Sequence, residues 1–158
     1  KEKVQSSAPA SAQQQKIINT LFAMLPAAAD SFTQALADLA DSSRVSFRGT
    51  AAELREVLRE VVDHLAPDDA VMSAPGFQLE KGRVGPTMRQ KVRFIVKSRG
   101  RGTGAAATTE DALAGADALV RSLYNRGSAA THSDQEKAEV LKIRGYTEAI
   151  LVDLLEIE

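Results

Sequence analysis

The strongest constraint on the fold of this chain is the spacing of apolar residues near its C-terminus. Separations that alternate between three and four residues define a seam of Val140, Ile143, Thr147, Ile150, Leu154 and Ile157. This spacing places the seam on one side of an α-helix, and Leu141, Leu151 and Leu155 widen the stripe beyond a narrow coiled-coil contact. We therefore predict a long C-terminal helix that packs inside a bundle in preference to a dimeric coiled coil.

Helical spacing also recurs upstream. Apolar stripes predict helices over residues 17–25, which end before Pro26, and over 27–41, 50–65, 86–97 and 108–125. Capping boxes are predicted at Thr50–Glu53 and Ser133–Glu136, and Thr108 is expected to cap the helix that follows it. Aromatic residues make up only 4% of the chain and Trp is absent, which favours Ala- and Leu-rich helices over a sheet. The expected fold class is all-α, a bundle of about five to six helices with a long C-terminal helix.

Two connections interrupt the helices. Residues 68–85 are rich in turn formers, with Pro75-Gly76 the clearest break, and a short hairpin over 77–84 is one option. Residues 98–107 (SRGRGTGAAA) are expected to form a flexible basic loop. Their glycines do not match the Gly-x-x-x-x-Gly-Lys pattern of a phosphate-binding loop.

The length of 158 residues suits one domain. We expect residues 1–12 to be disordered and 13–158 to form a single helical domain. The first residue is Lys1, which is consistent with a fragment or a processed product of a longer chain. No cysteine is present, which excludes disulfides and thiolate metal sites, and no apolar run reaches membrane-spanning length. A soluble, cytoplasmic protein is the expectation.

The net charge of −1 conceals a concentrated basic segment over residues 81–101. It holds eight cations and no acid, and without them the remainder has a net charge of −9. Such a segment is typical of phosphate binding, although a solvated helix face flanked by basic loops explains it equally well. Arg89, Arg93 and Lys97 fall on one helix face, where like charges repel unless an anion binds. With Arg99 and Arg101 they are the candidate RNA-binding residues.

A second candidate site is the stretch Arg126-Gly-Ser-Ala-Ala-Thr-His132, which contains one of only two histidines. Gly127 and Ser128 weaken the preceding helix, and the predicted cap at Ser133 starts the next. Such a break can bring a guanidinium and an imidazole to one cleft. An Arg neutralises phosphate charge and a His moves protons near neutral pH, so the pair is suited to phosphodiester cleavage.

Arg59 and His64 form a similar pair but in a different context. They lie inside one predicted helix, where an offset of five residues turns the side chains about 140° apart. His64 falls in the last turn before Pro67, where an imidazolium complements the helix dipole. We interpret this pair as structural.

The segment Leu-Tyr-Asn-Arg-Gly-Ser-Ala-Ala-Thr-His, residues 123–132, resembles the Arg-x4–6-His signature of HEPN-domain proteins. These are small α-helical bundles that include many metal-independent RNases. The sequence of this segment is also similar to that of nucleases predicted from bacterial anti-phage islands, some of them associated with prokaryotic PIWI proteins. The likeness covers about the C-terminal third of the chain. In HEPN RNases the residue after the Arg is often Asn, Asp or His, whereas here it is Gly127, with Asn125 just before the Arg.

This resemblance implies an endoribonuclease that needs no metal or other cofactor. His132 would act as general base on the ribose 2′-hydroxyl or as acid on the leaving oxygen, and Arg126 would stabilise the transition state. It also implies a homodimer whose two motifs share one cleft, and a role as a bacterial defence or toxin effector. Supporting candidates, for which packing or capping is an alternative explanation, are Tyr124, Asn125, Ser128 and Thr131.

Two other functions remain open at this stage. The chain could be a non-catalytic helical module that dimerises or binds a larger protein partner through the Val140–Ile157 seam. It could also bind nucleic acid through the basic segment without cleaving it, although few aromatic residues are available for base stacking.

Overall fold

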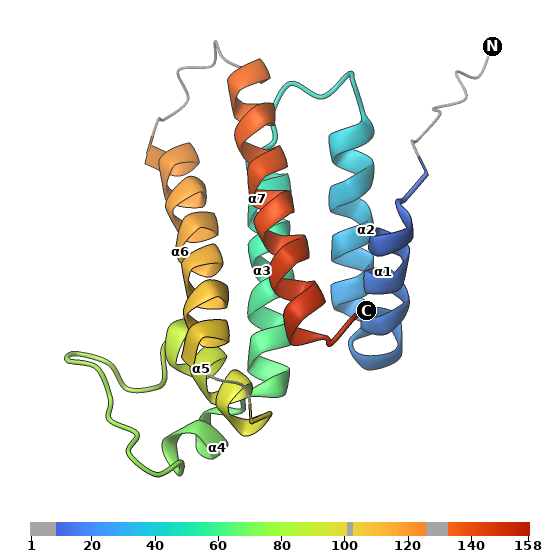
Figure 1. Cartoon of the computed structure of the whole chain (residues 1–158). Coiled ribbons are helices and arrows are strands. Elements are labelled where there is room, and N and C mark those ends of the chain that lie inside the picture. Colours follow the sequence, from blue (N-terminus) through green and yellow to red (C-terminus); the bar gives the residue numbers. More distant parts are fainter. Residues whose placement is uncertain (1–8, 101–102, 126–132) are drawn as a thin grey trace.

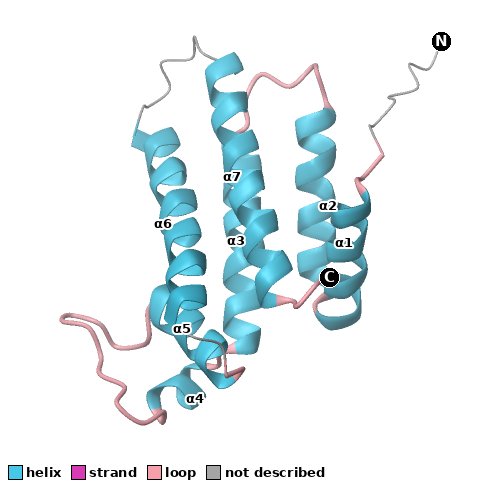
Figure 2. Cartoon of the chain, viewed as in Figure 1, coloured by secondary structure: helices cyan, strands magenta, loops and turns pink. Residues whose placement is uncertain are grey.

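The computed structural model describes residues 9–100, 103–125 and 133–158, and these form an all-helical bundle (Figure 2). The all-α prediction is therefore confirmed. The described residues form seven helices, one more than the upper estimate from sequence, because a short helix follows Pro67. The helices are α1 (Ala12–Met24), α2 (Pro26–Ala40), α3 (Arg48–Leu65), α4 (Asp68–Met72), α5 (Met88–Ser98), α6 (Thr103–Asn125) and α7 (Ser133–Leu154).

The break between α1 and α2 falls at Pro26, as predicted. Leu25 ends α1, and Pro26 occupies the first turn of α2. Proline suits this position because its missing N–H would have no partner inside the helix. The start of α1 lies within the segment expected to be disordered: Ser11 and Gln14 form a capping box, and the helix begins at Ala12. Residues 1–8, which make up the rest of that segment, lie outside the described residues.

Helix α3 forms the centre of the bundle. It packs against α2, α5, α6 and α7, and Figure 1 shows α7 lying along it. Its inward face is fully buried at Leu54, Val57 and Val61. The apolar spacing of α3 therefore sets which of its faces the other helices cover.

One residue of the apolar stripe predicted for α1 lies outside the core. Phe22 is 65% exposed, whereas Ile17 and Leu21 are buried.

The seam of α7 is buried within a single protomer. Val140, Ile143, Thr147, Ile150 and Leu154 are all buried, whereas Ile157 lies beyond the end of α7 and is half-buried against the core. The Thr147 hydroxyl donates to the Ile143 carbonyl at 2.8 Å, so its polar group needs no outside partner. The prediction of packing inside the bundle is confirmed, and the seam is not an exposed face on which a second chain could dock.

Two predicted helix starts are wrong. Thr50 does not cap α3, which begins at Arg48; its buried hydroxyl instead contacts an Asp38 carboxylate oxygen at 3.3 Å. Thr108 lies inside α6, which begins at Thr103, and α5 includes Ser98, so six of the ten residues of the expected loop over 98–107 are helical. A capping box does occur at Thr87, whose hydroxyl accepts from the Gln90 backbone N–H at 3.1 Å.

The connection from α3 to α5 is built from α4 and two tight turns. In the first turn, the Phe77 N–H donates to the Ala74 carbonyl at 3.1 Å, and Gly76 has a φ of +80°. In the second, the Arg83 N–H donates to the Glu80 carbonyl at 3.0 Å, and Gly82 has a φ of +79°. Glycine at the third position of such a turn accepts the positive φ without strain. The described part of this connection contains no strand, so the hairpin option is wrong.

Candidate functional site

The strongest sequence motif lies in the connection between α6 and α7. Arg126, Ser128, Thr131 and His132 are outside the described residues. Tyr124 and Asn125 are the last two residues of α6, and their side chains are also outside the described part. The roles assigned to these six residues therefore stay predictions. What the structure does describe is the pair of helices that flanks them.

These two helices pack along each other as an antiparallel pair (Figure 1). Their close approach depends on Gly115 of α6, because a Cβ built there would lie 3.0 Å from Cζ of Tyr146 on α7. At the other end of the pair, the Thr109 hydroxyl donates to an Asp153 carboxylate oxygen at 2.6 Å. The connection that carries the motif therefore joins two helices held by contacts along their length.

The start of α7 is also fixed to the start of α3. A Glu136 carboxylate oxygen accepts from the Phe47 backbone N–H and, at 3.3 Å, from the Ser46 hydroxyl. The Lys137 ammonium lies 5.9 Å from the centre of the Phe47 ring, within cation–π range. Glu136 was predicted to complete a capping box with Ser133. The Ser133 side chain lies outside the described part, so that capping box stays a prediction. The described hydrogen bonds of Glu136 satisfy the N-terminus of α3, so Glu136 joins two helices near the motif.

The predicted basic row lies on α5, and its first two arginines share one internal counter-charge. Arg89 donates to the Glu110 carboxylate at 3.1 Å, and Arg93 contacts the same carboxylate through two nitrogens. The Glu110 side chain is 6% exposed, whereas those of Arg89 and Arg93 are 65% and 60% exposed. The anion that offsets the repulsion between the two cations is thus supplied by α6. Both guanidinium groups still face solvent, and their role in RNA binding stays a prediction.

The other members of the predicted RNA-binding set differ from one another. Lys97 is exposed on the last turn of α5, with no ion-pair partner in the part of the chain that the structure describes. The Arg99 side chain is only 22% exposed and lies 3.3 Å from a Glu156 carboxylate oxygen, which connects the end of α5 to the C-terminal segment. Arg101 lies outside the described residues. Lys97 is therefore the clearest cation here that remains available to a ligand.

Lys91, another cation of the basic segment, has a structural role. Lys91 is 6% exposed, and its ammonium lies 2.8 Å from Asp63 of α3 and 2.6 Å from Asp68 of α4. Burial opposes the charged form, but the hydrogen bonds and charges of the two carboxylates outweigh it and hold the pKa of Lys91 above its ordinary value. Lys91 thus joins α3, α4 and α5.

Within one protomer, Arg89 and Arg93 lie far from the end of α6 that leads into the motif. Arg89 and Arg93 pair with Glu110, and fifteen residues of helix separate Glu110 from Asn125, a rise of about 22 Å. Figure 1 shows α5 beside the start of α6, at the opposite end of this helix from the end that leads into the motif. A ligand that contacted both would have to extend along this helix.

A polar cleft of about 410 Å³ follows α6 between these two regions. Its lining includes three arginines that are not in the predicted RNA-binding set, Arg55, Arg83 and Arg121. Arg55 is paired with Asp117 at 3.1 Å. Arg121 lies one helical turn before Asn125, so the cleft leads from the basic row toward the motif. Arg83 belongs to the basic segment over residues 81–101, whereas no sequence signal marks Arg55 and Arg121, because the three arginines come from α3, a turn and α6 and meet only in the folded chain.

The second Arg–His pair has the structural character expected of it. Arg59 donates to Glu56 at 2.7 Å and to Asp63 at 2.9 Å, and these carboxylates raise its pKa. His64 is exposed in the last turn of α3.

Two further properties concern the described residues alone. Over 9–100, 103–125 and 133–158, no three His, Asp or Glu side chains are grouped so that they could hold a metal ion. None of the helices in these ranges combines the length and apolar character needed to cross a bilayer.

Comparison with known proteins identifies the family. A family model described as predicted pPIWI-associating nuclease matches residues 23–153. A search of curated proteins and a search of solved structures each found no match. The matched region covers most of the chain, from the end of α1 to the last turn of α7, and includes the Arg126–His132 stretch. The chain therefore belongs to the family of predicted pPIWI-associating nucleases.

Proposed function

We propose that this member of the predicted pPIWI-associating nuclease family is a metal-independent endoribonuclease of HEPN type, with Arg126 and His132 in its active site. The observation that carries the proposal is the family match, because residues 23–153 include both α6 and α7 and the connection that bears the two side chains. The all-helical bundle is consistent with the HEPN resemblance of the C-terminal third.

The chemistry follows from the two side chains. His132 removes the proton from a ribose 2′-hydroxyl, whose oxygen attacks the adjacent phosphorus, or it protonates the departing 5′-oxygen. Arg126 donates paired hydrogen bonds to the phosphate oxygens, where negative charge increases in the transition state. The P–O5′ bond breaks, leaving a 2′,3′-cyclic phosphate on one fragment and a 5′-hydroxyl on the other. DNA is not a substrate, because it lacks the nucleophile.

The cleft along α6 supports a path for the RNA. Arg89 and Arg93 lie on α5 and pair with Glu110 in the first half of α6, whereas Arg121 lies near the end of α6 that leads into the motif. A single strand that follows this cleft would place successive phosphates near these guanidinium groups. Glu110, Asp111 and Asp117 also line it, so we expect the path to guide a strand more than to hold it tightly.

The proposal includes two partners. One Arg and one His are few groups for this reaction, so we expect two protomers to place their motifs in one cleft, as in the HEPN RNases that the segment resembles. The family description names association with pPIWI. We propose that the chain cleaves RNA in a defence response alongside such a protein, which would supply targeting.

The decisive experiment is an RNA cleavage assay in EDTA. Wild-type protein is incubated with single-stranded RNA beside His132→Ala and Arg126→Ala, and His64→Ala serves as the matched control because His64 is the second histidine and is exposed. We expect cleavage by the wild type and the control, a cyclic-phosphate product, and a rate at least about a hundredfold lower in the two motif variants. Full 2′-O-methylation of the RNA should abolish cleavage.

Each alternative gives a different result. Cleavage that survives both motif substitutions would contradict the assigned site, and cleavage that requires added Mg²⁺ would contradict the metal-independent mechanism. Tight binding without cleavage would indicate a nucleic-acid-binding domain, and neither binding nor cleavage would indicate an interaction module. Sedimentation of the same samples reports whether the chain dimerises.

A further inference from the structure

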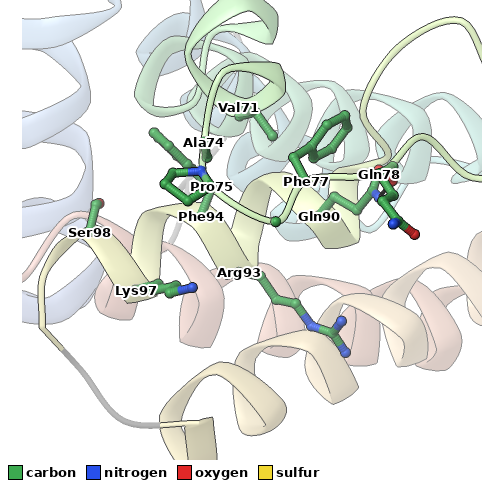
Figure 3. Close-up of a pocket in the computed structure, with 11 residues that line it drawn as sticks. Val71, Ala74, Pro75, Phe77, Gln78, Gln90, Arg93, Phe94, Lys97 and Ser98 are labelled. Atoms are coloured by element: carbon green, nitrogen blue, oxygen red, sulfur yellow. Dashed lines mark hydrogen bonds between the residues drawn. The ribbon is translucent and has the colours of Figure 1, made fainter.

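A pocket of about 600 Å³ lies between α5 and the turn that follows α4 (Figure 3). Its volume is within the range that holds a small organic ligand. The pocket is separate from the polar cleft along α6, although both have walls on α5. Neither the motif nor the proposed cleavage reaction uses it.

One wall of the pocket is apolar and partly aromatic. Phe77 and Phe94 are half-buried side chains that line it from opposite elements, with Pro75 and the buried Val71 beside them. The turn with Gly76 at a φ of +80° places Phe77 in this wall. The chain has only 4% aromatic residues, and two of its five phenylalanines line this pocket. Aromatic side chains that line a binding site can bind nucleobases of any sequence by stacking.

The other wall is cationic. Arg93 and Lys97, one helical turn apart on α5, line the pocket, and none of its described lining residues is acidic. Arg93 extends toward α6, where Glu110 binds it, whereas Lys97 has no ion-pair partner in the described chain (Figure 3). The dipole of α5 alone favours a cation at its C-terminal turn, but it does not explain an acid-free pocket with aromatic walls.

Amide groups complete the edge of the pocket. The Gln90 side chain is already used, because it donates to the Gln78 carbonyl at 2.8 Å and accepts from the Thr87 N–H at 3.0 Å. The exposed side-chain amide of Gln78 is left to a ligand, and it offers both a donor and an acceptor to the edge of a base.

From this arrangement we propose that the pocket binds one nucleotide, with its base against Phe77 and Phe94 and its phosphate on Lys97. The nucleotide is either free in solution or one unit of an RNA strand. Arg93 of the pocket lining binds Glu110 of α6, which is fifteen residues or about 22 Å of helix from Asn125, so within one protomer the nucleotide in the pocket is not the one at the scissile phosphate. The proposal goes beyond the cleavage function and does not require Arg126 or His132.

The first test is isothermal titration calorimetry with 5′-AMP and 5′-UMP, with adenosine and inorganic phosphate as the two halves of the ligand. We expect both nucleotides to bind more tightly than either half, with an affinity that falls as salt is raised. Lys97→Glu should weaken nucleotide binding about tenfold. The control is Lys142→Glu, an equal change of charge at an exposed lysine on α7, and it should stay within about twofold of the wild type.

A second variant tests the aromatic wall without relying on charge. Phe94→Leu keeps an apolar side chain but removes the aromatic face, and it should weaken 5′-AMP binding about fivefold or more while leaving phosphate binding unchanged. Thermal melting of this variant reports whether the bundle remains folded. Lys97→Glu needs no such check, because the side chain is exposed.

The two sources of the nucleotide are separated by competition with a short 2′-O-methylated RNA, which cannot be cleaved by 2′-hydroxyl attack. Displacement of 5′-AMP by this RNA indicates a strand, and no displacement indicates a free nucleotide; both support the pocket. Absence of binding by any mononucleotide or RNA, or binding that Lys97→Glu and Phe94→Leu leave unchanged, would overturn it. Repeating the titration with His132→Ala keeps this result independent of the cleavage proposal.

Discussion

Replacing Lys91 by methionine tests whether a buried charge holds α3, α4 and α5 together. The Lys91 side chain is 7% exposed, and its ammonium contacts Asp63 at 2.8 Å and Asp68 at 2.6 Å. Methionine has a similar shape to the lysine stem, so Lys91→Met removes the charge without opening a large cavity. The change therefore isolates the two ion pairs.

The expected loss of stability follows from the exposure of the partners. A hydrogen bond to a charged group contributes about 1.5–3 kcal/mol, and two such bonds are lost. The side chains of Asp63 and Asp68 are 39% and 60% exposed, so water can solvate both carboxylates after the substitution. Two such bonds in a fully buried site would total about 3–6 kcal/mol, so with these exposed partners we expect a smaller decrease in unfolding free energy, of about 2 kcal/mol. For a chain of this length, this corresponds to a decrease in Tm of about 4–8 °C.

The measurement is urea denaturation followed by circular dichroism at neutral pH. The control, Lys142→Met, changes an exposed lysine on α7 and should alter the unfolding free energy by less than about 0.5 kcal/mol. If Lys91→Met were as stable as the wild type or more stable, the free-energy cost of burying the ammonium would equal or exceed the stabilisation by its two ion pairs. That result would refute the stabilising role assigned to Lys91.

Three further predictions concern the bundle. Folding raises the pKa of Lys91, so the contribution of its ion pairs to the unfolding free energy is complete below the unfolded pKa and is lost as pH rises through the folded pKa. The difference in unfolding free energy between wild type and Lys91→Met, measured by urea denaturation, should therefore decrease in strongly alkaline buffer. Gly115→Val should lower the unfolding free energy by about 1–3 kcal/mol by crowding Tyr146, and a Tyr146→Ala background should reduce this loss. The control is Gly145→Val, whose Cβ meets no neighbour within 4 Å; it should not lower the unfolding free energy, because valine is a better helix former than glycine. Equal losses at the two glycines would argue against close packing. Thr87→Ala should cost about 1 kcal/mol by removing the cap of α5, and Ser98→Ala, a hydroxyl at the other end of the same helix, should cost less; the reverse order in chemical denaturation would contradict the cap.

Helix positions were predicted well where the signal was local. Pro26 marks the start of α2 because proline acts through its own backbone, and the α7 seam was read from apolar spacing alone. The starts of α3 and α6 were predicted incorrectly for a different reason. The hydroxyl of Thr50 is bound by Asp38, on another helix, and α6 extends back through Gly104 against the local preference of glycine.

The candidate site was also predicted only where the signal was local in the sequence. The basic row on α5 could be read from four-residue spacing, but Glu110 is 17 residues from Arg93 and 21 from Arg89, and no local pattern links them. Phe77 and Phe94 share a pocket because the turn at Gly76 folds one element over another. The Arg126–His132 stretch was selected from residue chemistry and spacing, and its function stays a prediction that the cleavage assay tests.

The antiparallel arrangement of α6 and α7 has a practical consequence for immobilising the protein. Helix α7 has 22 residues and is about 33 Å long, so its two ends are far apart. The Glu158 backbone carbonyl accepts from the Lys16 ammonium at 2.7 Å, which holds Glu158 against α1. A biosensor tether attached at Glu158 would lie near the end of α7 that is remote from Ser133. The end of the helical pair next to the motif would then remain open to analytes in the flow.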